Sequence, residues 1–188
     1  MIEDDFFAII DPLLGPTGST PEDGEEYRTP PLDVLRYYRR PVRLHWIPWF
    51  GRALGVVAVV RQPVDVGFSR DDYQRFLTRL AMAVNGRFPP WQRPGPRGLV
   101  IGLTTVVLTP EPIGPDDDAI LGQVLGSLGR SRTRAVPFGI LRVNLGQEAL
   151  AFALAGSDDQ LFPEPLLLAD ALSERLRRFV PLVDLGAG

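Results

Sequence analysis

The chain has 188 residues and a formal net charge of −3, and apolar residues make up 45% of it against 23% charged residues. This composition is typical of one globular domain and gives no overall attraction to nucleic acid or to a membrane surface. Because the sequence contains no cysteine, no lysine and one histidine, it excludes disulfides, thiolate metal sites, cysteine and lysine nucleophiles, lysine-dependent phosphate loops and multi-histidine sites within one chain.

The first thirty residues are acidic and rich in turn-forming residues. Residues 3–14 carry apolar side chains at helical spacing and predict a short helix, although Pro12 favours an earlier end. Residues 15–30 combine proline, glycine and acidic residues and predict a loop or a mobile arm. We therefore expect residues 1–30 to form an acidic helix and arm attached to a single α+β domain over residues 31–185.

A β-hairpin is predicted after this arm. Residues 31–40 first predict a second short helix, which ends at the proline that follows. Alternation over residues 42–49 predicts a strand, and residues 50–52 form the turn. The run 53–62 is apolar at successive positions, which predicts a strand buried on both faces.

The remaining elements alternate between long helices and apolar strands. The predicted helices have an apolar stripe at helical spacing, and the predicted strands are bounded by glycine and proline. Alternate alanines in the last strand indicate that a helix or another chain approaches it closely. The helices cover residues 69–85, 116–129 and 163–180, and the strands cover residues 99–108, 136–145 and 148–155.

Together these elements predict an α+β fold: a mixed, mostly antiparallel sheet of about five strands packed by three long helices. A hairpin followed by a helix occurs over residues 42–85 and again over residues 136–180, which suggests a possible internal ββα duplication with the helices on one face. Several strands lack polar alternate positions. We therefore expect the other face to be covered by the N-terminal segment, by proline-rich loops or by a second subunit.

The stretch 36–62 is the candidate binding region, because it holds six of the twenty arginines, the only histidine and two of the three tryptophans. Arginines interleaved with aromatics suit phosphate binding and base stacking. Residues 1–26, in contrast, carry eight acids and no base, so the arm could instead lie over this basic stretch. The candidate binding residues are Arg36, Tyr37, Arg39, Arg40, Arg43, His45, Trp46, Trp49 and Arg52.

The sequence contains no catalytic signature. His45 is flanked by apolar residues, and no serine or threonine motif supplies it with a nucleophile, so a structural hydrogen bond is the simpler interpretation. Glu111 and the acids 116–118 lack the spacing of a calcium loop and suit the start of a helix. We therefore expect no catalytic residues, no metal and no cofactor.

The function that the sequence favours is a non-enzymatic protein-interaction or adaptor module, either self-associating as a homodimer or part of a larger assembly. One alternative is an arginine- and aromatic-rich site for an anionic ligand or nucleic acid, and a second is a carboxylate-dependent enzyme. The acidic start is unlike a signal peptide, and the apolar run 53–60 is too short to span a bilayer. We therefore expect a cytoplasmic protein with no membrane segment.

Overall fold

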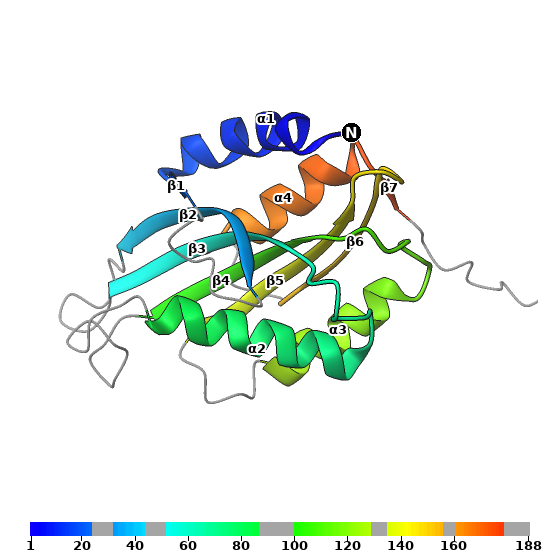
Figure 1. The fold of residues 1–188 in the computed structure, drawn as a ribbon. Helices are drawn as coiled ribbons and strands as arrows, with labels where there is room; N and C mark the ends of the chain where they lie inside the picture. The colour runs from blue at the N-terminus through cyan, green and yellow to red at the C-terminus, as the bar shows by residue number, and fades with distance from the viewer. Residues whose placement is uncertain (24–31, 44–51, 87–99, 129–134, 156–160, 179–188) are drawn as a thin grey trace, which may run out of the picture.

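The structure, a computed structural model, describes residues 1–23, 32–43, 52–86, 100–128, 135–155 and 161–178. These residues form a sheet with helices on both faces (Figure 1). The elements are α1 (Glu3–Leu14), a 3₁₀ turn η1 (Gly15–Thr17), β1 (Thr20–Asp23), β2 (Asp33–Arg43), β3 (Arg52–Arg61), α2 (Arg70–Gly86), β4 (Val100–Leu108), α3 (Asp117–Leu128), β5 (Ala135–Asn144), β6 (Ala149–Leu154), α4 (Glu164–Ser173) and β7 (Arg177–Arg178).

The sheet is mixed, and its strands lie side by side in chain order from β1 to β7. β1, β2 and β3 are antiparallel, β3, β4 and β5 are parallel, β6 is antiparallel to β5, and β7 is parallel to β6. The α+β class is confirmed. The predicted counts are wrong, because the described residues contain seven strands and four α-helices, not about five strands and three long helices.

Connection handedness accounts for the positions of three helices. Links between parallel strands through a helix are almost always right-handed. The links β3–α2–β4 and β4–α3–β5 join strands of one direction and step the same way across the sheet, so α2 and α3 cover the same face. β6 and β7 run in the opposite direction, so the same hand puts α4 on the other face, beside α1 (Figure 1).

No second subunit is needed to cover the sheet. Side chains of α1 and α4 pack on one face in a continuous cluster with Val57, Val106 and Leu141, while α2 and α3 pack on the other face. Of the three expected covers, the N-terminal segment is confirmed, since α1 buries Phe6 and Ile10 completely. The proline-rich loop over residues 89–98 lies outside the described residues. The reason for expecting a subunit over an exposed sheet face is therefore removed.

The apolar runs are buried as expected. In β3 both Val56 and Val57 are buried although they face opposite sides, because each side is covered by helices. The alternate alanines of β6 pack against α3, which confirms the predicted close approach of a helix. Among the apolar residues of the predicted helices and strands, Phe152 is only partly buried, and the following are buried: Val57, Val59, Phe76, Leu80, Ile101, Leu103, Leu172 and Leu176.

The short helix predicted over residues 31–40 is wrong, because residues 33–43 form β2. Pairing with β1 on one side and β3 on the other outweighs a weak local helix preference. Pro41 is tolerated because the pairing with β1 reaches only to Arg39, which leaves Pro41 at the open side of the sheet. Of the strand predicted over residues 42–49, Val42 and the following arginine belong to β2, and the remainder lies outside the described residues.

Two further boundaries differ from the predictions. The predicted arm contains η1 and the edge strand β1, which pairs with β2. The last helix ends at Ser173 and not at residue 180, and Arg177–Arg178 then pair with β6 as β7. The helices of the two hairpin–helix units also lie on opposite faces, not on one face as the duplication hypothesis expected.

Candidate protein-interaction surface

The predicted site residues on β2 are divided between the two faces of the sheet. Successive residues of a strand point to opposite faces. Arg36 contacts α1 on one face, and Arg40 contacts the start of α4 on that same face. Tyr37 is buried in the cluster that contains α2, on the opposite face. A helix would have brought these residues to one side, whereas the strand separates them.

Arg36 is held by α1. Its Nη1 donates to Asp11 Oδ2 at 2.6 Å, and its guanidinium lies 4.0 Å from the centre of the Phe7 ring. The Tyr38 hydroxyl donates to the other carboxylate oxygen of Asp11, also at 2.6 Å. Burial and the hydrogen bond to Asp11 raise the pKa of Tyr38, so this hydroxyl stays protonated and keeps its donor role. Asp11 thereby fixes the C-terminal half of α1 on β2.

Other arginines of β2 and β3 also pair with acids of the chain. Arg39 forms an ion pair with Glu22 of β1. Arg61 donates to both oxygens of Glu3 at 2.8 and 2.7 Å and to Asp33 at 2.9 Å. These contacts support the interpretation that the acidic N-terminal segment lies over the basic stretch, and they occupy arginines that an external anion would need.

Arg40 forms the most buried of these pairs. Its Nε donates to Glu164, a carboxylate that is only 2% exposed, and its Nη2 donates to the backbone oxygen of Leu161 at 2.6 Å. Gly55 makes room for this pair, because a Cβ there would lie 2.8 Å from Glu164 Oε1. The pair fixes the start of α4 on the sheet.

Three glycines on neighbouring strands form a shallow trough for the segment that leads into α4. Glu164 lies over Gly55 of β3, while a Cβ at Gly102 of β4 would be 2.5 Å from the Phe162 ring. A Cβ at Gly139 of β5 would be 2.8 Å from Pro165. Residues 161–165 therefore cross three strands at close range.

A third apolar cluster, here called the end cluster, lies at the amino ends of the parallel strands. A β-bulge in β5, where Leu103 pairs with Pro137 and Thr104 with Gly139, adds Phe138 to the strand. The Phe138 and Phe162 rings have centroids 4.5 Å apart. Phe138 and Leu161 are only partly buried. The end cluster consists of Val42, Ala53, Phe138, Leu161 and Phe162.

The backbone at this end of the sheet also holds the two outermost predicted arginines. Arg43 ends β2 and Arg52 begins β3, and they are partners across the ladder, next to the partners Val42 and Ala53. Val136, which lies two residues before Phe138 in β5, is 41% exposed. The other predicted site residues, His45, Trp46 and Trp49, lie outside the described residues.

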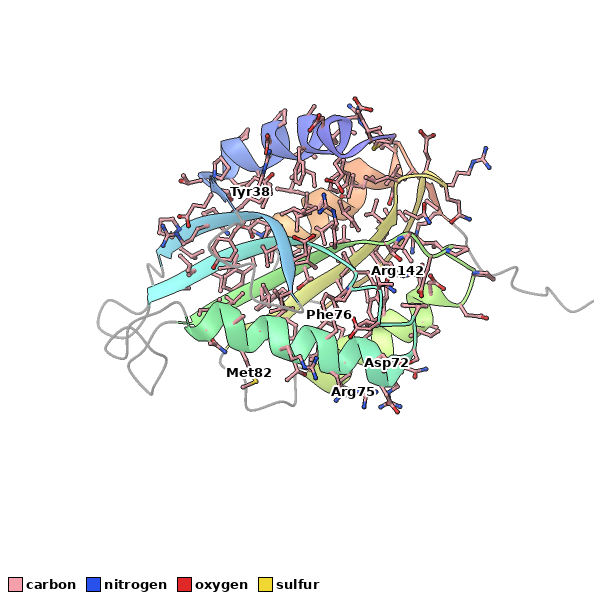
Figure 2. The ribbon with its side chains drawn as sticks, in the orientation of Figure 1. Tyr38, Asp72, Arg75, Phe76, Met82 and Arg142 are labelled. Atoms are coloured by element: carbon pink, nitrogen blue, oxygen red, sulfur yellow. The ribbon has the colours of Figure 1, made fainter. Side chains whose placement is uncertain are left out.

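The opposite end of the parallel strands is closed by a polar cluster that the sequence analysis missed. Arg142 of β5, labelled in Figure 2, has no exposed surface. Its guanidinium stacks 3.9 Å from the centre of the Phe68 ring. All five of its N–H groups have acceptors within the chain. These are the Tyr73 hydroxyl, the Pro112 carbonyl, Asp117, the Thr109 hydroxyl and Glu111. The one available signal was a single charge inside the apolar run of β5.

The polar cluster holds the link between β4 and α3 against the sheet. Asn144 donates to the carbonyls of Pro110 and Glu111 at 3.2 and 2.8 Å. Gln147 accepts from the backbone N–H of Ile113 at 2.9 Å. Burial raises the pKa of Asp117, although the guanidinium of Arg142 opposes this shift. Because its donors are used internally, this cluster is suited to a structural role.

Neither a metal site nor a membrane helix was found in the described parts of the chain. No group of three or more histidine, aspartate or glutamate side chains there could hold a metal ion. None of the helices described combines the length and the apolar character that a bilayer crossing requires. Comparison of the chain with protein-family models, with curated proteins and with solved structures gave no match.

Proposed function

We propose that the protein is a non-enzymatic protein-interaction module whose contact surface is the end cluster with the neighbouring Val136. The observation that carries this proposal is the pair Phe138 and Leu161, two large apolar side chains that are left partly exposed at the amino ends of β3, β4 and β5. The bulge in β5 adds Phe138 to the strand there, and bulges often re-aim a side chain next to a functional site. Partly exposed aromatic side chains of this kind are common anchors of protein interfaces.

The other surfaces of the described chain are less suited to a partner. The two sheet faces are covered by helices. At one edge, β1 contains Pro21 and two acids, which discourage pairing with a further strand. Towards the other edge, the carboxylate of Asp118 accepts the backbone N–H of Phe152 at 2.8 Å. These features favour the end cluster over strand addition as the mode of contact.

The alternative functions receive less support. Arg36, Arg39 and Arg40 already pair with acids of the chain, so a shared anion site built on these three is disfavoured. The carboxylates Asp117 and Glu111 are engaged with one buried arginine, which disfavours a carboxylate-dependent reaction there. The protein-interaction proposal needs neither set of residues.

The experiment compares Val136→Glu with the matched control Val64→Glu, which places the same charge on a fully exposed valine after β3. Sedimentation velocity measures self-association, and affinity capture from the native host measures binding of other proteins. We expect the wild type and Val64→Glu to form the same dimer or to retain the same partner. Val136→Glu should lose that dimer or that partner. A monomeric wild type that retains the same proteins as Val136→Glu would contradict the proposal.

A further inference from the structure

The segment that leads into α4 is held by one arginine of β2. Arg40 Nη2 donates to the backbone oxygen of Leu161 at 2.6 Å, and Arg40 Nε donates to the carboxylate of Glu164. These two acceptors lie three residues apart in the chain and bind to one rigid, planar group. The guanidinium therefore fixes residues 161–164 at both ends.

Arg40 also lies beside the end cluster. It is paired with Gly55 across the ladder, and the missing side chain of that glycine leaves the space that Glu164 fills. Val42, the next residue of β2 on the same face, belongs to the end cluster. The guanidinium thus connects the β2 side of the end cluster to the segment that supplies its other side.

The held segment supplies the part of the end cluster that a partner would meet. The carbonyl that accepts from Arg40 belongs to Leu161, whose side chain is only partly buried. Phe162 follows it, and its ring lies against that of Phe138, with 4.5 Å between the two centroids. A binding surface needs its side chains held to within about 0.5 Å by supporting contacts. The Arg40 guanidinium provides such a contact for Leu161 and Phe162.

We infer that Arg40 is a positioning residue of the proposed contact surface: the geometry of its guanidinium, and not its charge alone, sets where Leu161 and Phe162 lie. This inference rests on the proposed function and names the contact that holds its surface in shape. A lysine at position 40 keeps the charge beside Glu164, but its ammonium lacks the rigid pair of donors that reaches both acceptors. Arg40→Lys therefore separates positioning from charge balance.

The experiment compares Arg40→Lys with the control Arg61→Lys in the full chain. Arg61 also bridges two acceptors, Glu3 and Asp33, but it ends β3 at the opposite end from the end cluster. A fluorinated phenylalanine at position 162 reports the surroundings of that ring through its fluorine resonance. We expect the resonance to shift or split in Arg40→Lys and to keep its wild-type position in Arg61→Lys.

Association is measured by the sedimentation and capture assays already described for Val136→Glu. Arg40→Lys should weaken the dimer, or the capture of the partner, about tenfold, which is the effect of losing one charge-assisted hydrogen bond. Arg61→Lys should match the wild type. If circular dichroism shows that Arg40→Lys is unfolded, Arg40→Met/Glu164→Leu replaces it, because apolar replacement of a buried ion pair is often neutral or stabilising. The same changes in resonance and association are expected from that variant.

Two results would overturn the inference. One is a fluorine resonance that keeps its wild-type position in the folded Arg40 variant. The other is a folded Arg40 variant that retains in full the association that Val136→Glu removes. If Val136→Glu removes no association, the proposed function fails instead, and the fluorine resonance still decides whether Arg40 positions Phe162.

Discussion

Arg142 Nε donates a hydrogen bond to the Tyr73 hydroxyl at 3.2 Å, and this contact joins β5 to α2 inside the protein. The Tyr73 hydroxyl in turn donates to Gln62 Oε1 at 2.6 Å, so the residue that directly follows β3 belongs to the same network. A fully buried arginine is tolerated here because each of its donors has an acceptor and two carboxylates balance its charge. The network therefore ties three elements together at the carboxyl ends of the parallel strands.

Arg142→Met should strongly destabilise the protein. The methionine fills part of the space but leaves the buried carboxylate of Asp117 without its guanidinium partner, which costs about 3–5 kcal/mol in a buried pair. Urea unfolding measures the change. Arg178→Met is the control, because Arg178 pairs with Asp118 at an exposed position and its loss should cost at most about 1 kcal/mol. Equal effects of the two substitutions would contradict the structural role of Arg142.

Gly102→Ala and Gly126→Ala should change stability in opposite directions. The methyl group at Gly102 would lie 2.5 Å from the Phe162 ring, and overpacking of this kind typically costs about 1–3 kcal/mol. Gly126 lies within α3 with open space around it, so alanine there should stabilise by up to about 1 kcal/mol. Thermal unfolding of the two variants measures both changes. A neutral Gly102→Ala would show that residues 161–165 do not cross the sheet as described.

Leu80→Ala should destabilise the core between α2 and the sheet. Leu80 is 1% exposed and belongs to the larger apolar cluster, so the cavity should cost about 2–5 kcal/mol. Met82→Ala on the same helix is the control, because Met82 is 61% exposed and points away from the sheet (Figure 2). A difference of less than half a kilocalorie per mole, roughly the effect of a surface substitution, would place Leu80 at the surface.

The double variant Asp11→Asn/Glu22→Gln should bind heparin more tightly than the wild type. It removes the carboxylates that pair with Arg36 and Arg39 while α1 and β1 remain in place. Asp4→Asn/Asp71→Asn changes the net charge equally at two exposed positions and is the control. The measurement is the salt concentration that elutes each protein from a heparin column. Equal elution of both variants would show that overall charge, and not these two pairs, governs retention.

The elements with strong internal patterns were predictable from the sequence. The apolar stripe of α2 placed that helix correctly. In the structure the Ser69 hydroxyl caps the helix by accepting the N–H of Asp72 at 3.2 Å. The apolar run 99–108 placed β4, because a strand covered on both faces needs no polar positions. These elements are specified by local residues and by burial alone.

The elements that depend on distant pairing were not predictable. β2 reads as a weak helix in isolation and becomes a strand because β1 and β3 pair with it. β7 has two residues and exists only through its pairing with β6. The candidate site shares this dependence. Phe138 joins the end cluster because of a bulge in β5, and Phe162 joins it because the glycines let residues 161–165 cross the sheet. Neither the bulge nor the crossing has a recognisable pattern in the neighbouring sequence.

If another protein contacts the end cluster, photo-crosslinking in the native host should capture that protein. A photoreactive amino acid replaces Val136 in one variant and Val64 in the other, since both valines are exposed and they lie at opposite ends of the parallel strands. We expect a discrete crosslinked product, to a second copy or to one partner, from position 136 and none from position 64. A product from position 64 alone, or the absence of any product from position 136, would contradict it.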